Sequence, residues 1–271
     1  MQEWKYFALL FGIVFIAGCT YLPGITGGGG TGVIISSFTP SDTTVEPNTP
    51  ILLSLVVQNT GGAKATNINA DLGGLTQDWR IEGGRSRPIP DLNPPDPTRG
   101  INQGEQDEED WTLSAPGLSS QFNYPLSVQV SYDYTTTSDN LIRATSIDYY
   151  KTNKPQTGVI ESKTTSGPLS VTVTAPNAVF AGSTVPVYFQ IHNQGSGRVK
   201  DDTVNVNIQG SGFDCHGKSQ VKLIQGSDGF LRCDASTAGV TTFMDFRISV
   251  YLSYTYTINA AASITVNPTP V

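Results

Sequence analysis

The feature that most constrains this chain is a pattern that occurs twice. Residues 45–61 (VEPNTPILLSLVVQNTG) align without gaps with residues 179–195 (VFAGSTVPVYFQIHNQG), 134 positions further on. A second matching pair, 131–135 (SYDYT) and 253–257 (SYTYT), follows in the same order. Tandem copies of one supersecondary pattern predict two domains of one fold.

Each copy contains short segments in which apolar and polar residues alternate, such as 126–132 (LSVQVSY). Alternation buries one face of an antiparallel sheet and leaves the other in water. Roughly seven such strands per ~100 residues is typical of immunoglobulin-like domains. We therefore predict an all-β protein of two tandem immunoglobulin-like antiparallel β-sandwiches, at 33–151 and 168–268, joined by a polar linker at 152–167. A β-barrel of similar size is the alternative.

The N-terminus carries an apolar run, 6–16, that ends in Ile-Ala-Gly followed by Cys19. This pattern is typical of a secretory signal. The four residues resemble the lipobox of bacterial and archaeal lipoproteins, which implies a signal peptide at 1–18, lipidation of Cys19 and a glycine-rich tether at 19–32. The alternatives are an uncleaved anchor helix or cleavage with secretion. All three predict an extracytoplasmic protein, held at the cell membrane in the first two.

Composition limits the partners. The net charge is -7 and the pI is about 4.7, whereas nucleic acids and anionic lipids need a basic patch. We predict membrane contact through the N-terminal lipid or anchor, no nucleic acid, no cofactor, and an unknown surface protein or glycan as partner.

Two cysteines remain once Cys19 is assigned to lipid. Cys215 and Cys233 are 18 positions apart in the same predicted domain. An even pair in an oxidising compartment predicts a disulfide. A zinc site built on these cysteines and His216 would lack a fourth ligand.

The segment 85–110 is rich in proline and then in carboxylates. Hard cations want six to eight oxygen ligands, but no calcium-loop spacing is present. We favour a solvated acidic loop and keep calcium as the minor hypothesis. Its candidate ligands are Asp91, Asp96, Glu105, Asp107 and Glu108.

No catalytic motif is recognisable. The chain has two histidines, His192 and His216, and neither belongs to a nucleophile or metal signature. Gly-x-Ser-x-Gly, phosphate-binding and dinucleotide-binding patterns do not occur. We therefore predict that the chain is not an enzyme.

The strand ending at the Asn-X-Gly turn of each copy resembles the adhesion-type immunoglobulin-like domains of archaeal and bacterial surface proteins, namely CARDB-like and S-layer-associated modules. In physical terms, Asn59 and Gly61, or Asn193 and Gly195, would supply positive φ and local side-chain hydrogen bonds to a tight turn. We interpret these four residues as structural.

Tyrosines cluster late in each copy and could form either core or a carbohydrate-stacking surface, of which we favour core. The leading hypothesis is a lipid-anchored, non-enzymatic surface protein with an adhesion, spacer or scaffold role. The alternatives are a polymerising subunit of a surface filament or layer, and an accessory glycan- or peptide-binding component of a secreted hydrolase or transporter.

Overall fold

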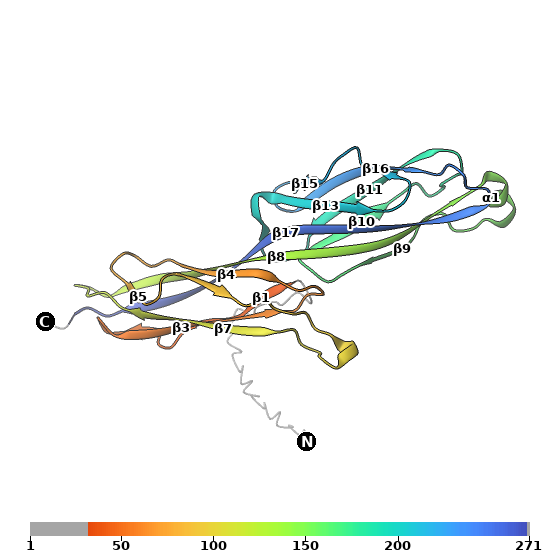
Figure 1. Ribbon diagram of the computed structural model, residues 1–271. Coiled ribbons are helices and arrows are strands. Elements are labelled where there is room, and N and C mark those ends of the chain that lie inside the picture. Colours follow the sequence, from red (N-terminus) through yellow and green to blue (C-terminus); the bar gives the residue numbers. More distant parts are fainter. Residues whose placement is uncertain (1–31, 270–271) are drawn as a thin grey trace, which may run out of the picture.

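The computed structural model describes residues 32–269, so the predicted signal peptide and Cys19 lie outside the described residues. The described chain is elongated and almost entirely β (Figure 1). In chain order the elements are β1 (Val33–Pro40), β2 (Thr44–Val45), β3 (Pro50–Asn59), β4 (Thr66–Gly73), β5 (Arg80–Ile81), β6 (Ser86–Ile89), η1 (Pro97–Arg99), β7 (Gln106–Ser114), β8 (Phe122–Thr145), α1 (Ile147–Asn153), β9 (Gly158–Thr164), β10 (Leu169–Thr174), β11 (Thr184–Asn193), β12 (Arg198–Val199), η2 (Lys200–Asp202), β13 (Thr203–Gln209), β14 (Phe213–Asp214), β15 (Gln220–Lys222), β16 (Asp228–Ser236) and β17 (Phe243–Val266).

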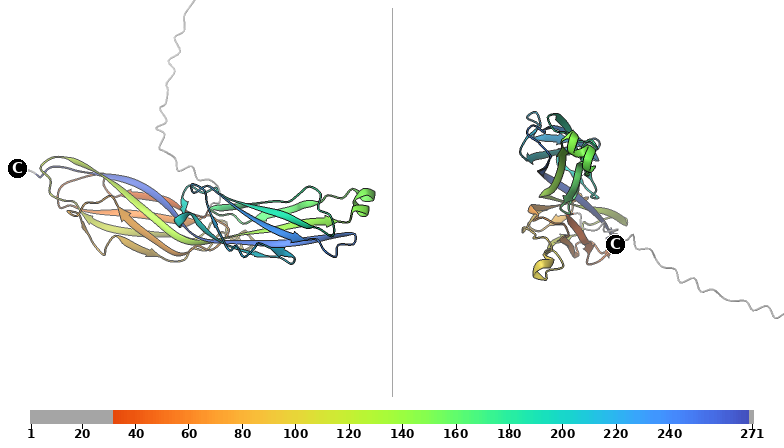
Figure 2. Two further views of the ribbon diagram at one scale, coloured as in Figure 1. Left: turned by 90° about the horizontal axis from the view of Figure 1, so that it is seen from above. Right: turned by 90° about the vertical axis from the view of Figure 1, so that its right-hand side faces the viewer.

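The strands form two sandwiches placed end to end (Figures 1 and 2). The first has the four-stranded sheet β1-β3-β7-β5 as one layer, and the second has the equivalent sheet β10-β11-β16-β14. A nine-stranded sheet, with the path β15-β13-β17-β8-β4-β6, supplies the other layer of both. The predicted fold class, antiparallel β-sandwich, is confirmed.

The two sandwiches share a pair of continuous strands. β8 and β17 are each 24 residues long. They pair antiparallel without a register shift from Phe122↔Val266 to Thr145↔Phe243. β4 pairs with the first half of β8, and β13 pairs with the first half of β17. We call the β8–β17 pair the ribbon.

The ribbon makes the observed boundaries differ from the predicted ones. The prediction placed residues 258–266 at the end of the second domain. They lie instead in the first sandwich, where β17 pairs with β2 and with the start of β8. The predicted linker, 152–167, holds the end of α1 and all of β9, which pairs with β8. The chain leaves the first sandwich on β8 and returns to it on β17, so the sandwiches are interleaved.

Alternation along each strand places the core. On the ribbon, even-numbered residues point inward except Phe122 and Met244 near its two ends. The twist that strands naturally carry turns this face toward different partner sheets in the two halves (Figure 1). In the first sandwich, Trp111 is fully buried and Trp79 is 4% exposed.

Candidate functional site

The two tyrosine motifs meet at the waist, where the ribbon passes between the sandwiches. Tyr134 lies directly opposite Tyr254, and Tyr132 directly opposite Tyr256. Their ring centroids are 6.2 Å and 5.9 Å apart respectively. All four side chains are at most 5% exposed, which confirms that they are core. This rules them out as a carbohydrate-stacking surface.

The hydroxyl groups of these tyrosines hold the repeated turns. Tyr134 Oη accepts a hydrogen bond from the Ala63 amide at 3.0 Å, and Tyr256 Oη accepts one from the Gly197 amide at the same distance. Ala63 and Gly197 occupy equivalent positions of the two copies. The other two hydroxyls accept from the first strand of each four-stranded sheet: Tyr132 from the Val33 amide (3.2 Å) and Tyr254 from the Leu169 amide (3.3 Å).

The Asn-X-Gly turns make the side-chain hydrogen bonds that the sequence predicts. Asn59 Nδ2 donates to the carbonyls of Ala63 and Leu92 at 2.9 and 2.8 Å, and Asn59 Oδ1 accepts from the Gly61 amide at 3.0 Å. In the second copy the same bonds join Asn193 to the carbonyls of Gly197 and Gly226 and to the Gly195 amide.

The predicted positive φ at these turns is wrong. None of Asn59, Gly61, Asn193 and Gly195 is among the positive-φ residues of the described chain. Glycine is required for a different reason, because a Cβ on Gly61 would overlap the Tyr134 hydroxyl, and one on Gly195 would overlap that of Tyr256. The turns and the tyrosines are one structural unit.

The predicted disulfide is present. Cys215 and Cys233 are bonded, with their Cα atoms 4.1 Å apart. Cys233 is on β16, and Cys215 begins the loop after β14. The bond holds this loop, which carries His216, against the second sandwich.

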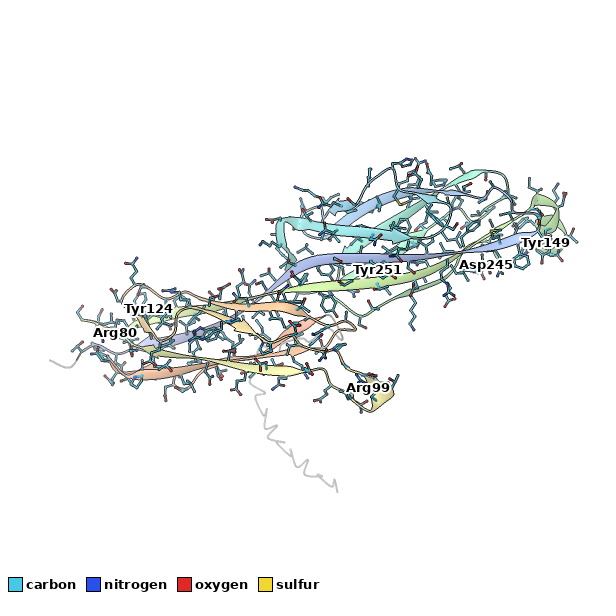
Figure 3. All side chains as sticks on the ribbon, in the orientation of Figure 1. Arg80, Arg99, Tyr124, Tyr149, Asp245 and Tyr251 are labelled. Carbon is cyan, nitrogen blue, oxygen red and sulfur yellow. A yellow bond between two sulfur atoms is a disulfide. The ribbon has the colours of Figure 1, made fainter. Side chains whose placement is uncertain are left out.

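The candidate calcium ligands do not converge. Asp91 forms an ion pair with Lys64 at 2.8 Å, whose hydrogen bond lowers the pKa of Asp91. Asp96 accepts hydrogen bonds from Thr98 and Arg99 on η1, which projects from the first sandwich (Figure 3).

The other three candidates also have separate partners or places. Glu105 accepts from the Asn93 amide (2.8 Å), and Glu108 accepts from Ser54 (2.8 Å). Asp107 lies on β7 beside Glu108. Within residues 32–269, no cluster of three or more His, Cys, Asp or Glu side chains is placed to hold a metal ion.

The outer faces of the two four-stranded sheets differ in chemistry although their backbones correspond. On the first sandwich, Ser54 lies opposite Asp110, and Val56 opposite Glu108. The Ser54 hydroxyl is 2.5 Å from Asp110 Oδ1 as well as 2.8 Å from Glu108. This face is acidic.

On the second sandwich the equivalent pairs are Tyr188 opposite Arg232 and Gln190 opposite Phe230. Tyr188 is 48% exposed and Phe230 is 62% exposed. Both rings are therefore on the surface of a sheet whose sister presents a serine and a glutamate.

Both histidines border this face, and each contacts aspartate. His192 Nδ1 is 2.9 Å from Asp228 Oδ1, and His216 Nε2 is 3.1 Å from Asp234 Oδ2. Hydrogen bonds from Ser227, Gln190 and His192 lower the pKa of Asp228. The pKa of Asp234 is lowered, above all by the Arg232 guanidinium. The aspartates are thus ionised at neutral pH.

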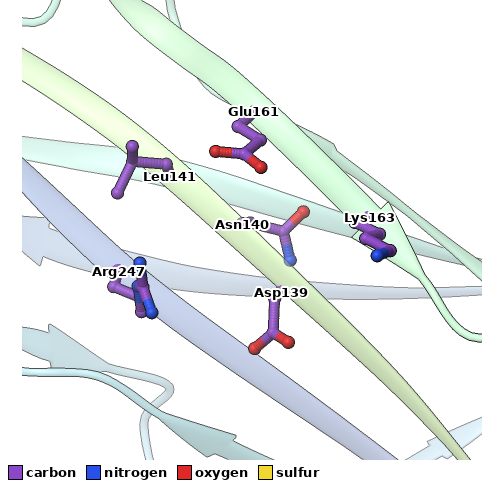
Figure 4. A pocket seen from close by; sticks show the side chains of 6 residues that line it. All are labelled: Asp139, Asn140, Leu141, Glu161, Lys163 and Arg247. Carbon is purple, nitrogen blue, oxygen red and sulfur yellow. The ribbon is translucent and has the colours of Figure 1, made fainter. Parts of the chain in front are cut away.

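Hollows along the ribbon are open and polar. One at the waist, of about 470 Å³, lies between Lys64, Asp133 and Asn205. Another, of about 330 Å³, lies beside Arg198 and Asp202. A third, of about 220 Å³, is lined by Asp139, Asn140, Leu141, Glu161, Lys163 and Arg247 from β8, β9 and β17 (Figure 4). The last mixes two carboxylates with two basic groups.

Sequence reasoning named neither Tyr188 nor Phe230 as a site residue. The late tyrosines were considered as a binding surface instead, because they cluster visibly in the sequence. The signal that could have found Tyr188 was in the repeat alignment, which pairs it with Ser54 on a strand position expected to face water. Phe230 has no such signal, because the alignment does not extend to β16.

The described residues contain no helix of sufficient length and apolarity to cross a membrane. The predicted anchor lies outside them.

Comparisons with known proteins do not identify a family. No protein-family model matches the sequence. No curated protein matches it either. Among solved structures, the crystal structure of collagen adhesin from S. aureus aligns over 89% of this chain and 96% of that chain, with 11% identity and a TM-score of 0.16. This TM-score is too low to carry an argument, so the sandwich assignment rests on the strand pairing alone.

Proposed function

We propose that this chain is a non-enzymatic cell-surface protein whose two sandwiches form one rigid body with an adhesion or scaffold role. The observation that carries the proposal is the ribbon. Because β8 and β17 pair without interruption through both sandwiches, bending at the waist would break strand pairing and expose the buried tyrosines. A rigid body presents the outer faces of both sandwiches at a fixed separation.

The point of attachment favours presentation of both sandwiches over a stalk-like spacer. The chain enters the fold at Gly32, whose carbonyl accepts from the Thr60 amide at 2.8 Å. A Cβ on Gly32 would lie 2.9 Å from the Tyr132 hydroxyl, so this residue is at the waist. Lipid on Cys19 would leave 13 residues of tether, which reach about 45 Å at most. Such a tether would hold the molecule by its middle.

The filament alternative gains less support. Exposed strand edges are the usual sites of strand addition. In the four-stranded sheets, the edge strands β5 and β14 have two residues each. The edge strand β1 has an irregularity between Ile35 and Ser37 and ends at Pro40. Short, bulged and proline-bearing edges resist addition of another chain, so of the four edges of these sheets only β10, six residues long and regularly paired with β11, lacks such protection.

The test uses intact cells that carry the full chain and matched cells that lack it. Protease added outside should digest the described domains in intact cells, and cells that lack the chain should attach less to surfaces coated with their own envelope material. A chain that external protease reaches only after lysis would contradict the surface location. Equal attachment by both cell types would contradict the adhesion role.

A further inference from the structure

We propose that the outer face of the β10-β11-β16 sheet binds a neutral, hydroxyl-rich glycan chain across Tyr188 and Phe230. This inference deepens the proposed function, on which it rests, by naming a surface and a ligand class. It starts from the comparison of two sister sandwiches within one molecule.

The sister sandwich shows that the fold does not need these aromatic rings. The first sandwich builds the same pair of strands with Ser54 in place of Tyr188 and Glu108 in place of Phe230. A large apolar side chain that is about half exposed gains less from packing than a buried one, and exposed apolar groups gathered on one face mark interaction sites. Two such rings on one face therefore indicate a contact made with something outside the chain.

The face is a flat grid of nine side chains on three paired strands. Its rows are Thr174, Tyr188 and Arg232; Thr172, Gln190 and Phe230; and Ser170, His192 and Asp228. Tyr188 and Phe230 are diagonal neighbours, a relation in which residues lie about 7 to 8 Å apart. The grid thus sets two rings among hydroxyl, amide and charged groups.

The charges of the grid favour an uncharged ligand. Arg232 and Asp228 are its only charged members when His192 is neutral, and they cancel. Asp234, on the same side of β16 and 3.1 Å from the Arg232 guanidinium, leaves the face with a single unbalanced negative charge. A polyanion would need several unbalanced cations and a polycation several unbalanced carboxylates. The face offers neither.

The composition of the grid favours a glycan over a protein. The core of a protein interface is enriched in aromatic residues and Arg, but it is also more apolar than the surrounding surface and depleted of Asp and Ser. Only two of the nine residues are large and apolar, and polar side chains separate them. Sugars carry apolar C–H faces that pack on aromatic rings and a rim of hydroxyls that both donate and accept, which matches two rings set among Thr172, Gln190 and Asp228.

The disulfide supports one border of this face. Cys215–Cys233 fixes the loop that brings His216 to within 3.1 Å of Asp234. Asp234 follows Arg232 on the same side of β16, and its carboxylate orients that guanidinium. The hydrogen-bonding groups beside Tyr188 are thus held in place before a ligand arrives.

The experiment measures binding of linear hexasaccharides of glucose, N-acetylglucosamine and mannose to the full membrane-extracted chain by titration calorimetry. We expect at least one to bind, and Tyr188→Ser and Phe230→Gln each to weaken it about tenfold, the usual worth of one aromatic contact. Serine is the residue of the sister sandwich at the first position, and glutamine is the uncharged form of its glutamate at the second. The affinity should not change between about 0.05 and 0.5 M salt.

The matched controls are Tyr251→Ser on the ribbon and Phe122→Glu, which alter a tyrosine and an exposed phenylalanine outside this face (Tyr251 is shown in Figure 3). They should bind like the unaltered chain. Failure of all three sugars to bind, binding that Y188S and F230Q leave unchanged, or a steep fall with salt would overturn the proposal. The proposal would also be overturned if the unaltered chain bound an envelope protein that neither Y188S nor F230Q bound. These results leave the protease test of surface location standing, so the two proposals can fail separately.

Discussion

At the scale of single residues, four tyrosine hydroxyls fix the backbone at the waist, two at the repeated turns and two at the starts of β1 and β10. Each is buried and accepts a backbone amide, so the hydroxyl satisfies a donor that the sheets leave without a partner. The rings supply apolar contact at the waist, and the hydroxyls fix the Asn-X-Gly turns against it.

Removing one hydroxyl tests this role. We expect Tyr134→Phe and Tyr256→Phe each to lower the free energy of unfolding by about 1 to 2 kcal/mol, because a partly buried amide loses its acceptor. Urea denaturation measures the effect. Tyr251→Phe is the control and should change stability by less than about 0.5 kcal/mol. Equal stability of all three variants would show that the turns find other partners.

Alkaline pH should act on the same residues. Burial raises the pKa of Tyr132 and Tyr254 well above the ordinary value near 10. A pKa raised in the folded state contributes stability that is present below about pH 10 and is lost as pH rises above it, because only the unfolded chain then releases the proton. We expect tyrosinate absorbance from these residues to appear together with unfolding. Their ionisation in the folded protein near pH 10, seen with unchanged circular dichroism, would contradict their burial.

At the scale of elements, the second sandwich has a covalent constraint between a loop and a strand. Cys215–Cys233 closes a loop over 18 positions. Replacing both cysteines by alanine should lower the free energy of unfolding by about 3 kcal/mol in the chain-entropy model, and it should release the His216 loop. Denaturation with and without reductant measures the first effect, and the His216 resonances report the second. Unchanged His216 resonances would show that the loop is held without the bond.

At the scale of the whole molecule, the interleaving of the chain predicts that truncation at the end of β17 weakens the first sandwich rather than the second. Deleting 258–271 removes the last nine residues of β17, which bury Ile264 and Val266 in the first sandwich. We expect amide hydrogen exchange to become fast in β1, β3 and β7 while β11 and β16 keep their protection. Deleting only 267–271 is the control. Loss of protection in β11 and β16 instead would mean that the end of β17 supports the second sandwich.

Part of this fold follows from the sequence. The ungapped repeat predicted two similar sandwiches, and alternation such as that of 126–132 predicted antiparallel strands, since both depend on local pattern. The late echo of Ser-Tyr-X-Tyr-Thr also marked the tyrosines as paired features. The disulfide followed from the even number of remaining cysteines in one domain.

The ribbon did not follow from the sequence, because its inward positions stop being apolar at the waist. Thr136, Ser138 and Asn140 are buried, and their groups are satisfied by Tyr254, Thr164 and Ser162, which come from other strands. The run Ala260, Ala261, Ala262 likewise hides the alternation of β17. A local pattern therefore divided each long strand into two.

The sequence by itself determined the all-β class, the two-fold repetition and the disulfide, because each is a matter of residue spacing along the chain. Only the tertiary structure decided that the sandwiches share two strands, that the repeated tyrosines face each other, and that Tyr188 and Phe230 lie on one surface. These depend on strand pairing between residues about 40 to 120 positions apart, whose cost in loop closure is repaid only when the whole sheet forms.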